Sequence, residues 1–286
     1  MTLGKQNTEK SQPKPTEHAK VEVRSLRLSL NIRYRLCGEL TRSRSHILKN
    51  GRTEDQTKFT DENLQKYDAL FFLSNTGEVL DDSGKTALQS YLNKGGNFVA
   101  VHSASDCLQT TAFYGREVGA YFDYHPELQN ATVDVIGPSH PSTAAIPSAW
   151  KVVDEMYNFK SDPRSLGAIV VLAANESSYV DDGTRKFDQG TPHPIAWYQE
   201  LGAGAEQEHT AGRSFYTSLG HLNETWQDVL FLSHVLGGLR WALQSNTTLA
   251  FNQQGLVGNN DASAGSVSTL STAAPSTSST NIASPQ

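Results

Sequence analysis

The chain has 286 residues, a net charge of −6 and a hydrophobic fraction of 37%, enough for one large α/β domain or two small ones. The acidic balance argues against a nucleic-acid partner, because phosphate binding needs a clustered basic face. No segment approaches the roughly 18–20 apolar residues of a membrane-spanning helix, so no membrane span is expected.

Both ends of the chain are polar. Residues 1–20 are rich in Pro, Lys and Glu and lack an apolar signal core, so we expect a disordered start and the cytoplasm as default location. Residues 248–286 are rich in Ser and Thr and are expected to form a disordered tail. Such tails are often glycosylated outside the cell, so the localisation stays open. The folded domain is expected to span residues 21–247.

The first patterned segment is Leu26 to Leu36, where apolar and polar residues alternate strictly. This two-residue period predicts a strand with one solvent-exposed face. Such a strand does not suit the centre of a parallel sheet, where both faces are buried. Residues 70–73 form a short apolar run that predicts a buried strand. A helix is predicted from Asp81 or Asp82 to Gly95-Gly96. Its buried face should carry Ala87, Leu88, Tyr91 and Leu92.

Four further apolar runs predict buried strands. They cover residues 97–102, 168–173, 195–198 and 214–217. A last helix is predicted from Thr225 to about Leu243. Strands that are apolar on both faces and separated by helices favour a mostly parallel sheet covered on both sides. The fold class is therefore α/β, with a Rossmann-like or flavodoxin-like layout.

Two histidines stand where predicted strands end. His102 closes the strand over 97–102, and His221 follows the strand over 214–217. Ligands of open α/β sheets bind at the carboxyl ends of strands, so these side chains mark the expected site. A single strand-end histidine can also be purely structural. We assign His140 and His234 to structure, in a turn and on a helix face.

Other polar and aromatic residues extend this candidate site. Asp154-Glu155 precedes Met156-Tyr157, and carboxylates beside aromatic rings can transfer protons or bind sugar hydroxyls. The alternative is a solvated turn with one charge paired to Arg164. Trp197 could stack on a sugar ring or belong to the core.

Metal and thiol chemistry lack a strong signature. There is no H-E-x-x-H motif and no paired cysteine, so no cofactor is expected. The histidines and Glu155 could still converge on zinc, which we keep as the alternative. Cys107 is interpreted as a structural thiol without a catalytic role.

Six motifs follow one another between residues 46 and 243. They are YDALFFLSNTGEVLDD, GGNFVAVHSASD, FYGREVGAYFDYHPELQNATV, HPSTAAIPSAWKVVDEMYNF, HPIAWYQ and AGRSFYTSLGHLNETWQDVLFLSHVLGGLRWAL. Together they resemble the ThuA-like (trehalose-utilisation) family. The resemblance implies a class I glutamine-amidotransferase-like fold, which is a three-layer flavodoxin-like sandwich. It also implies a role in disaccharide or keto-sugar catabolism.

The sequence departs from this superfamily in two ways. Its glutaminases place a nucleophilic Cys on the tight turn after a strand, but the corresponding turn here carries His102, and Cys107 comes several residues too late. A Cys-dependent glutaminase is therefore not expected. Family members also begin with a buried strand and helix. Here either Leu26 to Leu36 replaces that strand or the strand is missing.

The leading hypothesis is an enzyme that acts on a small carbohydrate, such as a keto-disaccharide, as a hydrolase or lyase. Its catalytic residues would be His102, His221 and Glu155, with a substrate-binding set of Ser103, His125, Tyr157, His193 and Trp197. A non-catalytic carbohydrate-binding module and a zinc-dependent hydrolase are the alternatives. Homo-oligomer formation is left open.

Overall fold

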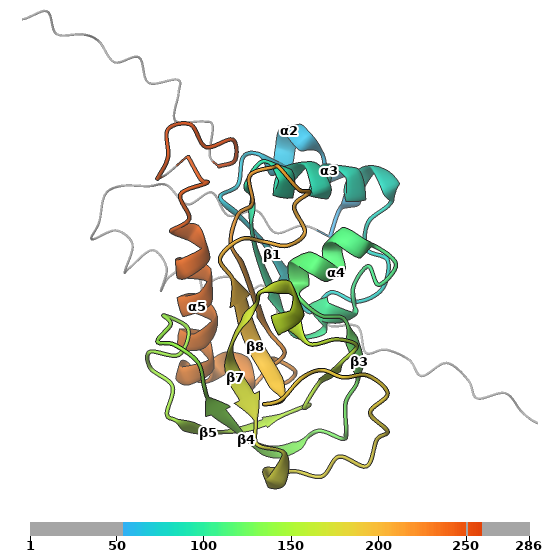
Figure 1. Cartoon of the computed structure of the whole chain (residues 1–286), viewed down its shortest axis with the longest axis vertical. Helices are drawn as coiled ribbons and strands as arrows, with labels where there is room; N and C mark the ends of the chain where they lie inside the picture. The colour runs from blue at the N-terminus through green and yellow to red at the C-terminus, as the bar shows by residue number, and fades with distance from the viewer. Residues whose placement is uncertain (1–53, 250, 259–286) are drawn as a thin grey trace, which may run out of the picture.

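The computed structural model describes residues 54–249 and 251–258 (Figure 1). The disordered start expected over 1–20, the strand expected over Leu26 to Leu36 and most of the expected tail lie outside these residues. The question whether the first strand of the family is replaced or missing therefore also falls outside the described residues.

The described part is built on a seven-stranded sheet with the order β1-β2-β9-β8-β7-β4-β5. A second, two-stranded antiparallel sheet pairs β3 with β6. The strands are β1 Ala69–Leu73, β2 Asn97–Val101, β3 Phe122–Tyr124, β4 Gln129–Val135, β5 Ala149–Asp154, β6 Asn158–Phe159, β7 Ile169–Ala174, β8 Pro194–Gln199 and β9 Ser214–Thr217. All five strands predicted between residues 70 and 217 are present, within one or two residues at their ends.

The expectation of a mostly parallel sheet is wrong. Only β1–β2 and β2–β9 pair in parallel, whereas β9–β8, β8–β7, β7–β4 and β4–β5 are antiparallel. The chain between β7 and β8 forms no α-helix, only the short 3-10 turn η4 Glu176–Ser178, so it returns along the neighbouring strand. Apolar runs report burial on both faces and carry no information on strand direction. The fold is a mixed α/β fold.

The α-helices lie on both faces of the large sheet (Figure 1). Alternate residues of β2 contact different cores: Phe98 packs with α3 and α4, and Val99 packs with α5. The helices are α2 Asp61–Leu64, α3 Asp82–Asn93, α4 Ala112–Val118 and α5 Val229–Leu243. The remaining 3-10 turns are η1 Gln56–Lys58, η2 His102–Asp106, η3 Pro163–Leu166 and η5 Thr225–Gln227.

Helix α3 begins and ends where the sequence predicts. The Asp81 carboxylate accepts a hydrogen bond from the Gly84 amide at 2.8 Å, which caps the first turn. Gly95, at φ +87°, follows the last turn and adopts a conformation that other residues rarely take. The predicted apolar face is buried, with Ala87, Leu88, Tyr91 and Leu92 in the core.

Helix α5 begins later than predicted. Thr225 opens the 3-10 turn η5, and Asp228 then caps α5 by accepting from the Leu230 and Phe231 amides, both at 2.8 Å. His234, on α5, is fully buried and donates from Nδ1 to the Ser142 carbonyl at 2.9 Å. This agrees with its assignment to structure.

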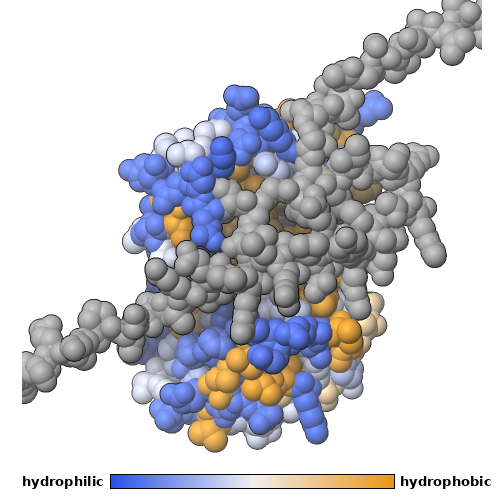
Figure 2. All heavy atoms as spheres, turned by 180° about the vertical axis from the view of Figure 1, so that it is seen from behind, coloured by the Kyte–Doolittle hydropathy of each residue, from blue (hydrophilic) through white to orange (hydrophobic). Residues whose placement is uncertain are grey.

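The packed chain continues past residue 247. Val257 is buried, and the Gly258 amide donates to the Gln65 carbonyl at 2.8 Å. Within the described residues, packing therefore continues to residue 258. Seen from behind, hydrophobic surface gathers toward the end of the molecule where β4 and β5 lie (Figure 2). Val153 on the edge strand β5 is among the exposed apolar side chains.

Candidate functional site

His102 stands at the sharp turn that follows β2. Its backbone has φ +58°, a conformation that non-glycine residues adopt rarely and that often marks functional positions. Its Nδ1 atom lies 2.8 Å from the Ser218 carbonyl oxygen, which can only accept, so Nδ1 carries the proton. The Nε2 atom therefore presents a lone pair.

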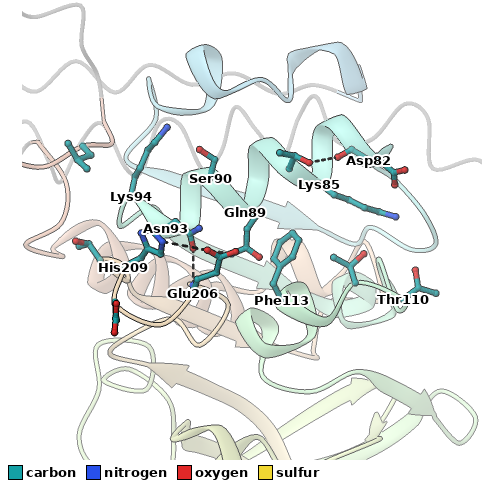
Figure 3. A pocket seen from close by; sticks show the side chains of 15 residues that line it. Asp82, Lys85, Gln89, Ser90, Asn93, Lys94, Thr110, Phe113, Glu206 and His209 are labelled. Carbon is teal, nitrogen blue, oxygen red and sulfur yellow. Dashed lines mark hydrogen bonds and ion pairs between the residues drawn. The ribbon is translucent and has the colours of Figure 1, made fainter.

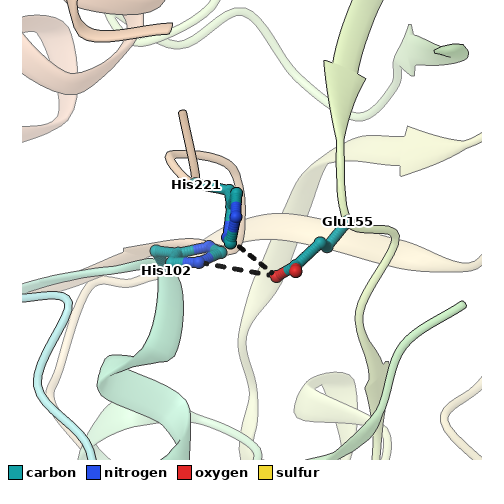
Figure 4. A group of neighbouring side chains, drawn as sticks. All are labelled: His102, Glu155 and His221. Atoms are coloured by element: carbon teal, nitrogen blue, oxygen red, sulfur yellow. Dashed lines mark ion pairs between the residues drawn. The ribbon is translucent and has the colours of Figure 1, made fainter. Parts of the chain in front are cut away.

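Glu155 and His221 meet His102 at this end of the sheet (Figure 4). Glu155 follows β5 and His221 follows β9 by a few residues. The Glu155 Oε2 atom lies 3.2 Å from Nδ1 of His221 and 3.7 Å from Nε2 of His102. The three residues predicted as catalytic are thus brought together.

Tyr157 and His125 complete the cluster. The Tyr157 hydroxyl lies 3.1 Å from Nε2 of His102, and Nε2 of His125 lies 3.6 Å from Oε1 of Glu155. The rings of His125 and Tyr157 are stacked, with centroids 5.4 Å apart. His125 comes directly after β3, which explains why the small second sheet matters for the site.

Asp154 joins two segments of the site, a role that the sequence did not reveal. Its Oδ2 accepts from the Gly220 amide at 2.8 Å and its Oδ1 accepts from the Glu155 amide at 2.9 Å. The carboxyl is almost fully buried, and burial raises its pKa to about 6. Asp154 thereby fixes the end of β5 against the loop that carries His221.

Burial sets the charge state of the central groups. It lowers the pKa of His102 to about 4, so the imidazole is neutral at neutral pH. Burial also raises the pKa of Tyr157, which keeps its hydroxyl protonated. Because His102 presents a lone pair, the Tyr157 hydroxyl is the donor of their hydrogen bond. His221 is the most exposed member of the cluster, with 42% of its side chain accessible to solvent.

His193 lies behind Tyr157 and not on the open side of the cluster. Its Nε2 donates to the Tyr157 carbonyl at 2.8 Å. On the other side of the ring, Nδ1 lies 3.0 Å from Oε1 of Glu176 and 3.2 Å from the Tyr179 hydroxyl. Burial lowers the pKa of His193. The side chain thus contacts the protein backbone, in contrast to the predicted substrate contact.

Trp197 is placed away from the cluster. Its indole is 1% exposed and donates to the Val118 carbonyl at 2.8 Å, while its ring packs against Phe159 and Tyr216. Its position inside β8 directs it to the core on the α4 side. Ser103 is half-buried and adjoins His102 in η2.

Two alternative readings of the sequence are also resolved. Arg164 pairs with Asp162 at 3.0 Å and not with the Asp154-Glu155 pair, so the solvated-turn reading is wrong. Cys107 is buried, and burial raises the pKa of its thiol to about 12, which leaves it un-ionised and unreactive at neutral pH.

A hollow lies elsewhere on the molecule (Figure 3). It is an open groove of about 1020 Å³ between α3, the start of α4 and the loop that carries Glu206 and His209. Two of its charged side chains pair locally: Lys85 with Glu78 at 2.7 Å, and His209 with Glu206 at 3.5 Å. It gathers no buried titratable groups, so we place the function at the His102 cluster.

The comparisons with known proteins show the family of the chain. The ThuA family, described as trehalose utilisation, matches residues 14–242, and the chain belongs to this family. The match begins closer to the N-terminus than the expected residue 46. A comparison with curated proteins gives no match. Among the described residues no helix has the length and apolar character to cross a bilayer.

Two solved structures share the fold. A ThuA-like protein from Bacteroides uniformis has a TM-score of 0.56 and 19% identity, covering 80% of this chain and 95% of its own. A ThuA-like protein from Parabacteroides merdae has a TM-score of 0.51 and 15% identity, covering 77% and 85%. At these identities the likeness concerns the fold alone.

Proposed function

We propose that this protein is an enzyme that transfers protons to and from a disaccharide-derived sugar at the cluster of His102, Glu155, His221, Tyr157 and His125. The observation that carries the proposal is the geometry of His102. Its Nε2 lone pair points toward Tyr157 and Glu155, at 3.1 and 3.7 Å, and the imidazole is held neutral. A fixed neutral imidazole beside a carboxyl group and a phenol is suited to general acid–base catalysis.

The cluster offers distinct roles to its members. His102 is the base, because Nδ1–H is fixed on the Ser218 carbonyl and Nε2, which accepts the hydrogen bond from Tyr157, is the nitrogen that can take up a proton. Tyr157 keeps its proton at neutral pH and can donate it to a sugar oxygen. His221 and His125 are the members open to solvent, at 42% and 33% side-chain exposure, so the sugar would reach the cluster between them.

The substrate class follows from the family. Its description is trehalose utilisation, which supports a disaccharide or a keto sugar derived from one. A thiolate glutaminase mechanism has no support here, because the residue at the turn after β2 is His102 and Cys107 is buried.

The test is turnover of a panel of disaccharides and their keto derivatives by the full chain, followed by product analysis. We expect turnover of at least one keto-disaccharide and a loss of about 100-fold or more in His221→Ala. The control is His209→Ala, an exposed histidine paired with Glu206 outside the cluster. Calorimetric sugar binding without any product would contradict the proposal and support a carbohydrate-binding module.

A further inference from the structure

The cluster also has the composition of a metal site. Two imidazole nitrogens and one carboxylate oxygen, from His102, His221 and Glu155, all lie within 4.8 Å of one another. We propose that these three residues bind a divalent cation of the zinc type. The inference rests on the proposed function, because it concerns the same site and names what assists the chemistry there.

The spacing of the ligand atoms fits one shared ion. Two ligand atoms that each lie about 2.1 Å from zinc at a tetrahedral angle are about 3.4 Å apart. The distances from Oε2 of Glu155 to Nδ1 of His221 and to Nε2 of His102 are 3.2 and 3.7 Å, on either side of that value. The third pair, the two imidazole nitrogens, lies within 4.8 Å, so the side chains would move together on binding the ion.

The surroundings of His102 also fit a ligand. Metal-binding histidines usually donate their second ring N–H to a carbonyl or carboxylate, which fixes the ring and directs the other nitrogen at the ion. His102 has this arrangement, since its Nδ1 lies 2.8 Å from the Ser218 carbonyl. The Nε2 lone pair is thereby directed at the space that Glu155 and His221 share (Figure 4).

Glu155 lacks a fixed positive partner. Its side chain is 12% exposed, and within the described residues its ion-pair partners are the histidines 102, 125 and 221, with no Lys or Arg among them. A buried carboxylate without a permanent cation is costly, and a bound divalent ion would supply the missing charge.

The ligand set favours one class of cation. Imidazole suits zinc and its neighbours in the first transition row, whereas Mg²⁺ and Ca²⁺ prefer oxygen ligands. Three protein ligands leave a coordination position open, as in catalytic zinc sites, and the exposed edge of His221 lets solvent or a sugar reach it. A bound zinc-type ion would polarise a carbonyl group of the sugar or lower the pKa of a bound water molecule. With the ion bound, Nε2 of His102 would be a ligand and no longer the base, so proton transfer would fall to Tyr157 and His125.

The experiment is titration calorimetry of Zn²⁺ into chelator-treated full chain. We expect one site that Mg²⁺ does not compete for. Glu155→Gln, which keeps the side-chain shape, and His221→Ala should each weaken Zn²⁺ binding at least about tenfold. The matched control is His209→Ala, which removes a histidine from an exposed His–Glu pair of 3.5 Å and should leave the affinity unchanged. Melting curves confirm that each variant is folded.

Absence of the one-to-one site, or affinity that survives both Glu155→Gln and His221→Ala, would overturn the inference. Turnover of a keto-disaccharide by protein shown to be metal-free would also overturn it and leave the proposed function intact. Stoichiometric Zn²⁺ binding at these residues without turnover of any sugar would support the metal site and contradict the proposed substrate class.

Discussion

The hydroxyl of Tyr157 lies 3.1 Å from Nε2 of His102, although the two residues are 55 positions apart in the chain. One follows β5 and the other follows β2, and the hydrogen bond therefore joins two separate strand ends. Each partner is buried, and each has the protonation state that the bond requires at neutral pH.

Tyr157→Phe removes this donor and leaves the ring in place. The ring packs on Phe122 at 4.5 Å and on His102 at 4.9 Å, so the melting temperature should change little. We expect kcat to fall by about tenfold to 100-fold with a smaller change in KM, because the phenol acts on the reacting group. Steady-state kinetics check this, and an unaltered kcat would remove Tyr157 from the mechanism.

His193 should act as a positioning residue for Tyr157. Its Nε2 donates to the Tyr157 carbonyl at 2.8 Å, and its Nδ1 lies 3.2 Å from the Tyr179 hydroxyl and 3.0 Å from Oε1 of Glu176. His193→Ala should lower kcat by about tenfold, while His193→Gln, which keeps a donor near the Nε2 position, should restore part of the loss. A merely structural role would lower stability in both variants and leave kcat of the folded fraction unchanged.

The buried carboxyl of Glu117 should make the folded state less stable as the pH rises. Its carboxyl is buried beneath the loop that carries Gly204, with Oε2 accepting from the Gly204 amide at 3.0 Å and Oε1 without a hydrogen-bond partner. Burial raises its pKa to about 8, from 4.5 in the unfolded chain. The folded state thus binds more protons between these values, and stability falls as pH rises through that window.

Glu117→Gln removes the titration and keeps the shape. The variant should be more stable than the parent at about pH 9, by a few kcal/mol, and closer to it at about pH 6. Urea unfolding at both pH values measures the difference. An equal difference at the two pH values would show that Glu117 is not protonated in the folded state.

The buried histidines His140 and His234 should make the folded state less stable as the pH falls, the reverse of the effect of Glu117. Both are buried with Nε2 atoms that lack hydrogen-bond partners, and burial lowers the pKa of each to about 4, from 6.5 in the unfolded chain. The unfolded state therefore binds more protons between these values, and stability is lost as pH falls from about 6.5 toward 4. The loss is on the order of 3 kcal/mol for each histidine as an upper limit.

The acid effect is isolated by comparing the parent with His234→Asn. The Asn amide keeps a donor near the Nδ1 position, which bonds the Ser142 carbonyl at 2.9 Å. Urea midpoints should be lower for the variant at neutral pH, because of lost packing, and should depend less on pH below about 6.5. Parallel pH profiles for the two proteins would contradict the assignment.

Local signals in the sequence predict much of the fold. Helix α3 is foreseen with its Asp81 cap, its buried face and its glycine stop, because each of these depends on neighbouring residues. The start of α5 is misplaced, since Thr225 and Asp228 are both good capping residues and only packing selects Asp228. Strand direction is also missed, because burial patterns are the same for parallel and antiparallel partners.

The site is predicted in part for a similar reason. The rule that ligands bind at strand ends identifies His102 and His221, and Glu155 joins them because β5 ends beside them. Sequence cannot show that His193 faces the Tyr157 backbone or that Trp197 points into the core, because both depend on which face of β8 packs on α4. The linking role of Asp154 arises from two backbone amides, which leave no mark in the sequence.

The central claim is that His102 performs chemistry at the turn after β2, and His102→Asn tests it most directly. Asn tolerates the φ of +58° and keeps an N–H for the Ser218 carbonyl, but it has no atom in the place of Nε2. We predict that kcat/KM for the keto-disaccharide turned over by the parent falls by about 100-fold or more, with a melting temperature close to that of the parent. A folded His102→Asn variant with the parent's kcat/KM would contradict the claim.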